Sequence, residues 1–192
     1  MLTYNTDPTL YRILSIDPGS FTLGWALLDL CLVERVVTVE NAGTFCSVFA
    51  PQQFPFLTEQ HGDRYTRLHH HQNALSQLLD LAKPQTVICE SPYLGRFPQA
   101  FETLVECLSM LRFTVADYDL GLAFETVDPP SAKKAVGASG RGGDKQAVRL
   151  ALSQLTKLRW GRVALNSLDE HAVDAIAVGC YKVRTLSDDF LF

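Results

Sequence analysis

An apolar stretch near the start of the chain, ILSIDPGSFTLGWALLDL (residues 13–30), contains Asp17 directly before Pro18 and Gly19. Its two halves have the apolar composition of strands, and Pro18 and Gly19 mark a turn between them. Burying a carboxylate is costly unless a cation or hydrogen-bond donors compensate it. The stretch therefore predicts a strand pair in which Asp17 is either a turn residue or a ligand for a cation or phosphate.

Apolar runs and chain breakers predict three strands, followed by helices that alternate with strands. The predicted strands cover residues 12–17, 24–30, 33–39, 86–90 and 122–127. The predicted helices cover residues 63–82, 97–115 and 168–184, with two shorter ones opened by Asp128 and Asp144. This order predicts an α/β fold with a mixed five-stranded sheet and helices on both faces. No repeat or linker divides the 192 residues, so we expect one domain over 1–192.

Charge is unevenly distributed along the chain. The net charge is −4, yet residues 131–162 contain eight basic residues and one acidic residue, against nine basic and twenty acidic elsewhere. Such a segment is typical of a surface that binds a polyanion, or of a solvated helix face. No stretch approaches the roughly 18 apolar residues of a membrane span, and the start lacks signal-peptide features. We therefore expect a cytoplasmic protein with no membrane partner.

Two further acids occupy positions that could bring them to Asp17. Glu90 ends the apolar run TVICE, and His171 and Asp174 are three residues apart on the last predicted helix, so they share a face. Each also fits an ordinary role as turn residue, ion-pair partner or helix surface. If the two strands are neighbours and the helix crosses their ends, three carboxylates and an imidazole meet. Oxygen-rich clusters favour Mg²⁺ or Mn²⁺, and two such ions about 4 Å apart support phosphodiester hydrolysis.

In these features and their order, the chain resembles the RuvC-type Holliday junction resolvases, which have the RNase H-like fold. The motifs ILSIDPGSFTLGWALLD, VICESPY and DEHAVDAIAVG carry the resemblance over nearly the whole chain. It implies a metal-dependent endonuclease that resolves four-way DNA junctions by paired symmetric nicks. It also implies two Mg²⁺ per active site, for which Mn²⁺ substitutes, held by Asp17, Glu90, His171 and Asp174.

The stretch SAKKAVGASGRGGDKQAV resembles the family's basic, glycine-containing segment. Lys133 and Lys145 align best with lysines near the scissile phosphate, and Lys134 remains an alternative to Lys133. Tyr93 occupies the place of an aromatic residue that can wedge into the junction, although a loop aromatic can also pack on its own domain. The candidate DNA-binding residues are Tyr93, Arg96, Lys133, Lys134, Arg141 and Lys145.

The resemblance further implies a two-fold homodimer through the helix that begins at about Phe97, with a branch-migration motor as a candidate partner. The acidic body and the departures in the glycine loop are compatible with a bacteriophage-encoded member that acts in the host cytoplasm. Three alternatives stay open. A related nuclease acting on flaps, other branched DNA or RNA–DNA hybrids would share much of the site. An actin-like ATPase or sugar kinase also begins with such a strand, but 192 residues are too few for its two lobes. A catalytically silent DNA-binding module would not need all four ligand candidates.

Overall fold

A six-stranded mixed sheet organises the computed structural model, which describes residues 8–94, 97–138, 145–187 and 190–191. The strands are β1 (Leu10–Asp17), β2 (Thr22–Cys31), β3 (Val36–Cys46), β4 (Thr86–Glu90), β5 (Ala123–Val127) and β6 (Leu158–Trp160). They lie in the order β5-β4-β1-β2-β3-β6. The first three strands form an antiparallel meander, β4 and β5 continue it parallel to β1, and β6 adds parallel to β3.

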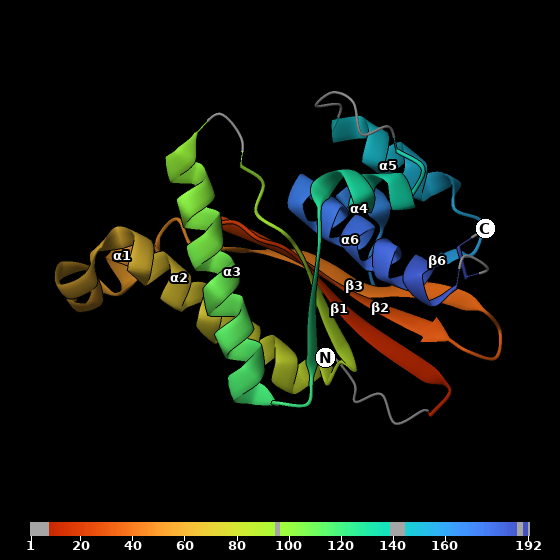
Figure 1. Ribbon diagram of the computed structural model, residues 1–192, viewed down its shortest axis with the longest axis horizontal. Helices are drawn as coiled ribbons and strands as arrows, with labels where there is room; N and C mark the ends of the chain where they lie inside the picture. Colours follow the sequence, from red (N-terminus) through yellow and green to blue (C-terminus); the bar gives the residue numbers. More distant parts are fainter. Residues whose placement is uncertain (1–7, 95–96, 139–144, 188–189, 192) are drawn as a thin grey trace.

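Helices cover both faces of this sheet. They are α1 (Ala50–Gln53), α2 (Pro55–Ala82), α3 (Pro98–Tyr118), α4 (Pro129–Ala135), α5 (Lys145–Gln154) and α6 (Glu170–Leu186), with a 3-10 turn at Leu165–Ser167. Figure 1 shows α2 and α3 on one side of the sheet and α4, α5 and α6 on the other. Each side has its own apolar core against the strands. The α/β class and the two-sided cover are confirmed. No helix within the described ranges has the length and apolarity needed to cross a membrane.

The prediction of five strands was wrong by one. The additional strand, β6, has three residues, of which only Leu158 is buried. So short an edge strand has no alternation for a sequence pattern to display. The third strand also differs from the predicted range 33–39, because it begins at Val36 and continues to Cys46. Its residues pair with β2 as far as Cys46 opposite Thr22.

The first long helix begins earlier than expected, at Pro55 rather than near residue 63. Its first part is separated from the rest at Gly62, whose φ of 82° and ψ of 165° are non-helical. Glycine tolerates this positive φ without the steric cost that a side chain would add. The amphipathic pattern that predicted the helix starts beyond this break, where buried residues such as Leu68 and Leu75 begin.

Two glycines let α6 approach the sheet closely. A Cβ placed on Gly24 of β2 would lie 2.2 Å from the backbone oxygen of His171. A Cβ on Gly179 of α6 would lie 2.5 Å from Leu28 and 2.8 Å from the hydroxyl oxygen of Ser15. Side chains at either position would push helix and sheet apart. The absence of both side chains therefore brings the start of α6 over the end of β1.

Candidate active site

Asp17 and Glu90 lie side by side at the same edge of the sheet. They end β1 and β4, which are parallel neighbours with Ile16 opposite Cys89. One residue further along each strand, the two carboxylates emerge at the carboxyl ends of the strands. In open α/β sheets this edge is where ligands bind.

The first turns of α6 bring His171 to Asp17. The His171 Nδ1 lies 2.9 Å from Oδ2 of Asp17, and its Nε2 lies 2.9 Å from the Thr22 hydroxyl. The hydrogen bond with Asp17 raises the pKa of His171, against the effect of burial. Thr22 was not foreseen, because 149 residues separate it from His171 and nothing in its neighbourhood marks it.

Asp169 precedes this helix and has a structural role. Its carboxylate accepts a hydrogen bond from the backbone N–H of Ala172 at 2.9 Å, the geometry of an N-cap. The hydroxyl of Thr44 on β3 donates to the same carboxylate oxygen at 2.7 Å. These contacts fix the start of α6 to the sheet and so help to place His171 and Asp174.

Three carboxylates interact electrostatically at this edge. Burial, followed by the charges of Asp17 and Asp174, raises the pKa of Glu90 to about 8, while Lys133 acts in the opposite direction. The pKa of Asp174 is also raised, first by burial and then by Asp17, and is lowered in part by Lys133 and His171. Like charges in a poorly solvated site disfavour ionisation. The structure therefore brings all four predicted metal ligands into one electrostatic cluster.

The chemistry of this donor set fits a hard divalent cation. Three carboxylates that repel one another supply oxygen ligands of the kind that Mg²⁺ and Mn²⁺ bind. Among the described residues, however, no group of three or more His, Cys, Asp or Glu side chains is gathered closely enough to hold a metal ion. Both ring nitrogens of His171 have protein partners, Asp17 and Thr22. The ligand set accordingly stays a prediction.

Of the two adjacent lysines, Lys133 faces the carboxylates. Its charge lowers the pKa of both Glu90 and Asp174. Lys134 is exposed and lines a different pocket, of about 300 Å³, with Tyr181 and Arg184 of α6. Helix α4 sets this difference, because consecutive helical residues point about 100° apart. The start of the helix is fixed by its N-cap, Asp128, whose side chain accepts a hydrogen bond from the Ser131 N–H at 2.9 Å.

Tyr93 lies next to Lys133 on the surface. Its side chain is 67% exposed and lines a pocket of about 270 Å³ with Pro129, Pro130 and Lys133. The predicted wedge and the predicted phosphate-binding lysine therefore share one hollow. Arg96 and Arg141 lie outside the described residues, and of Lys145 only its backbone position at the start of α5 is described.

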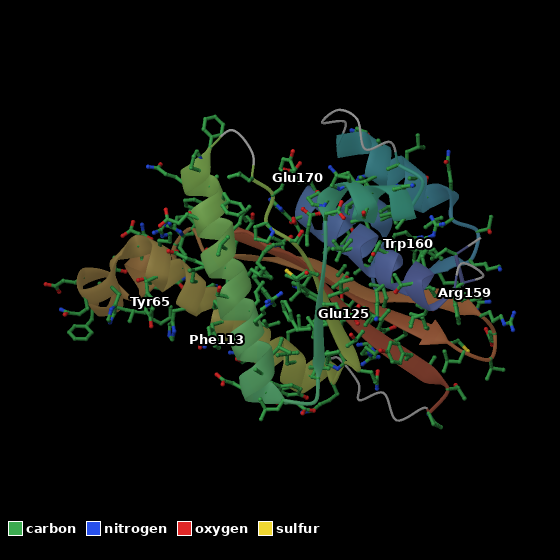
Figure 2. The ribbon with its side chains drawn as sticks, viewed as in Figure 1. Tyr65, Phe113, Glu125, Arg159, Trp160 and Glu170 are labelled. Carbon is green, nitrogen blue, oxygen red and sulfur yellow. The ribbon has the colours of Figure 1, made fainter. Side chains whose placement is uncertain are left out.

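Much of the basic segment does not face this site. Arg149 donates to the backbone oxygens of Leu165 and Leu168, the latter at 2.8 Å. Arg159 pairs with Glu34 at 3.0 Å, and Arg162 pairs with Glu40 at 2.7 Å. Figure 2 shows Arg159 and Trp160 well away from Glu170, which marks the start of α6. The charge count alone therefore overstated the basic surface available to DNA.

Comparison with known proteins gives one sequence relative and several solved structures with the same fold. No family model matches the chain. The crossover junction endodeoxyribonuclease RuvC of Wolbachia sp. subsp. Brugia malayi is 25% identical over 190 residues, covering 94% of this chain and 98% of that protein.

Two solved resolvases cover nearly the same length. RuvC of T. thermophilus in complex with a Holliday junction substrate has a TM-score of 0.66 at 15% identity, over 93% of this chain and 97% of that one. The yeast mitochondrial Holliday junction resolvase Ydc2 has a TM-score of 0.60 at 15% identity, over 96% of this chain and 84% of that one. The chain therefore resembles the RuvC-type Holliday junction resolvases in sequence over nearly its whole length, and it has their RNase H-like fold.

Proposed function

We propose that this chain is a metal-dependent endonuclease that resolves four-way DNA junctions, formed as a single nuclease domain over residues 1–192. The observation that carries the proposal is the convergence of Asp17, Glu90, His171 and Asp174 at one edge of the sheet. A RuvC relative and two resolvase structures of similar length support the choice of substrate.

Asp17, Glu90 and Asp174 would hold two Mg²⁺ ions, with Mn²⁺ as a substitute. When bound, such ions lower the pKa of a water and stabilise the attacking and leaving oxygens of an in-line displacement. The charge of Asp17 acts on both Glu90 and Asp174, so all three carboxylates would contribute to holding the ions.

His171 suits proton handling better than ligation. Either ring nitrogen would have to exchange its hydrogen bond with Asp17 or Thr22 in order to bind a metal. Proton acceptance from the attacking water at Nε2, in exchange for the Thr22 hydrogen bond, would instead use the basicity that Asp17 confers, because the hydrogen bond between Asp17 and Nδ1 raises the pKa of His171. Asp17 would hold the ring in the orientation that this requires.

Lys133 would offset the negative charge that develops on the phosphate. It already acts electrostatically on Glu90 and Asp174 from α4. Preorganised cations at such a position stabilise the transition state more than the ground state. Tyr93, in the same hollow, would stack on a base that the junction leaves unpaired.

A two-fold homodimer would place one such site against each of two opposed strands. Helix α3 supports this, because large apolar side chains on it and at its start are exposed, namely Phe97 at 74%, Val105 at 40% and Phe113 at 69%. Figure 2 shows Phe113 on α3. Pairing two copies along α3 would bury this surface.

The proposal is tested by cleavage of matched substrates in Mg²⁺ and in Mn²⁺. A mobile four-way junction, a flap, an RNA–DNA hybrid and a linear duplex of shared sequence are each end-labelled on every strand. We expect paired nicks at symmetric positions of the junction, with 5′-phosphate and 3′-hydroxyl ends. Faster cleavage of the flap or hybrid would assign the related nuclease class instead, and no cleavage of any substrate would leave a DNA-binding module.

A further inference from the structure

Phe21 is an exposed aromatic residue held at the active edge of the sheet. It lies in the turn between β1 and β2, four residues beyond Asp17, and its side chain is 53% exposed. Two hydrogen bonds from Ser47 fix the backbone of this turn. The Ser47 N–H donates to the Phe21 carbonyl at 2.9 Å, and the Ser47 hydroxyl donates to the Ser20 carbonyl at 2.8 Å. The ring is therefore presented from an anchored backbone.

Arg67 of α2 covers one face of this ring. Its guanidinium carbon lies 4.2 Å from the ring centroid, within the range of a cation–π contact. The Phe21 side chain remains 53% exposed beside this contact. Such a flat stack of a guanidinium and an aromatic ring can accept a further planar group on its free side.

The charge of Arg67 lacks an ion-pair partner within the part of the chain that the structure describes. No carboxylate pairs with it there, and its Nε is buried without a hydrogen-bond partner. Arg64, one turn earlier on the same helix, instead contacts Glu102 at 3.6 Å and Glu106 at 3.0 Å. A partly desolvated cation without an anion is unfavourable, and an external anion would relieve this cost.

Phe21 and Tyr93 contact elements that cover opposite faces of the sheet. Tyr93 shares a hollow with residues of α4, which packs against α6 on one face of the sheet. Phe21 contacts α2, which belongs to the apolar core on the other face. Asp17 and Glu90 end the two strands between these layers. Each face of the sheet therefore has an exposed aromatic residue near the edge where these strands end.

Resting on the proposed junction cleavage, we propose that Phe21 and Arg67 form a nucleotide-binding element across the site from Tyr93. The free face of Phe21 stacks on an unpaired base of the cleaved strand, and the guanidinium of Arg67 binds a phosphate of the same strand. Aromatic rings beside cations are a recurrent means of holding single-stranded nucleic acid, because every base has a π-face. The two aromatics would then hold the strand on both sides of the scissile phosphate.

The test compares Phe21→Leu and Arg67→Gln with control substitutions on α2. Phe56→Leu removes another exposed ring, 75% exposed, and Arg64→Gln removes a cation that is already ion-paired. Affinity for a junction and for a short single strand is measured without divalent ions over a range of salt concentrations. A 2-aminopurine at each nucleotide flanking the cut site reports stacking by its fluorescence.

We expect Phe21→Leu to weaken single-strand and junction binding by about 5- to 150-fold, the range for loss of one base stack. It should also remove the fluorescence change at one flanking nucleotide while leaving the salt dependence intact. Arg67→Gln should lower the slope of log affinity against log salt by about 0.7 to 0.9, as expected for one lost phosphate contact. Both controls should bind like the unaltered protein.

Equal affinity of Phe21→Leu and Phe56→Leu would overturn the proposal, even if the unaltered protein nicks junctions normally. An effect of Arg67→Gln without any effect of Phe21→Leu would also overturn it, because the site would then be a backbone contact alone. Failure of the unaltered protein to nick any junction would instead refute the proposed function. The binding comparison still decides the role of Phe21 in that case, since it requires no cleavage. Urea unfolding of each variant separates a binding defect from a folding defect.

Discussion

His71 makes the fold sensitive to acid in a way that can be calculated. It lies on α2 with a fully buried side chain, and neither ring nitrogen makes a hydrogen bond of normal geometry among the described residues, although the Ser20 backbone lies near enough to raise the pKa in part. Burial lowers its pKa to about 4, with a further contribution from the charge of neighbouring His70. The folded protein therefore holds this imidazole neutral at a pH where the unfolded chain protonates it.

The sign and size follow from linkage. A histidine with a lowered folded pKa contributes its full stability above pH 6.5, and that stability is lost as pH falls towards 4. A pKa gap of about 2.5 corresponds to about 3 kcal/mol over the whole window. Between about pH 7 and about pH 4.5 the loss attributable to His71 is about 2 kcal/mol.

The assay is urea unfolding of the unaltered protein and of His71→Leu at both pH values. Leucine does not titrate, so the variant should lose about 2 kcal/mol less of its unfolding free energy on acidification. Comparing the two losses removes the fixed cost of the substitution and the titration of other groups. An equal loss in both proteins would refute the reasoning, because it would mean that His71 is neither buried nor neutral in the folded state.

Three further outcomes are expected. Arg12→Met should lower the free energy of unfolding in urea by about 3 to 5 kcal/mol. The reason is that the substitution leaves buried Asp29, which lies 2.6 Å from the guanidinium, without its partner. A decrease below about 1 kcal/mol would contradict this. Gly24→Ala should lower both stability and nicking, since its Cβ would collide with the His171 carbonyl oxygen and displace α6; unchanged nicking would show that the helix tolerates the shift. Without divalent ions, Glu90→Gln should be more stable than the unaltered protein above pH 8, because the raised pKa of Glu90 makes its ionisation costly in the folded state. This advantage should disappear as the pH falls towards 4.5. The opposite trend in thermal unfolding would argue against the carboxylate cluster.

The central strands and their acids could be predicted because their signals are local. Apolar runs that end in Asp17 or Glu90, directly before Pro18 or Ser91, locate both the strands and the edge where they end. The helix carrying His171 and Asp174 was equally clear from its small apolar residues. Parallel pairing of β1 with β4 then brings these groups together.

The parts that escaped prediction depend on contacts between distant residues or on elements too short to show a period. The three residues of β6 are defined only by pairing with β3. The choice between Lys133 and Lys134 depends on the rotation of α4, and the stack of Arg67 on Phe21 joins a turn to a helix far along the chain. The surplus of basic residues in 131–162 overstated the basic surface available to DNA, because Arg159 and Arg162 are ion-paired with Glu34 and Glu40.

Asp17→Asn tests the central claim most directly. The variant and the unaltered protein are compared for junction nicking in Mg²⁺ and for junction binding in its absence, with Asp169→Asn as control because asparagine also serves as an N-cap. We predict that Asp17→Asn nicks about a thousandfold more slowly or not at all, while both variants still bind the junction. Asp169→Asn should retain nicking. Nicking by Asp17→Asn at the rate of the unaltered protein would contradict the assignment of this carboxylate cluster as the catalytic site.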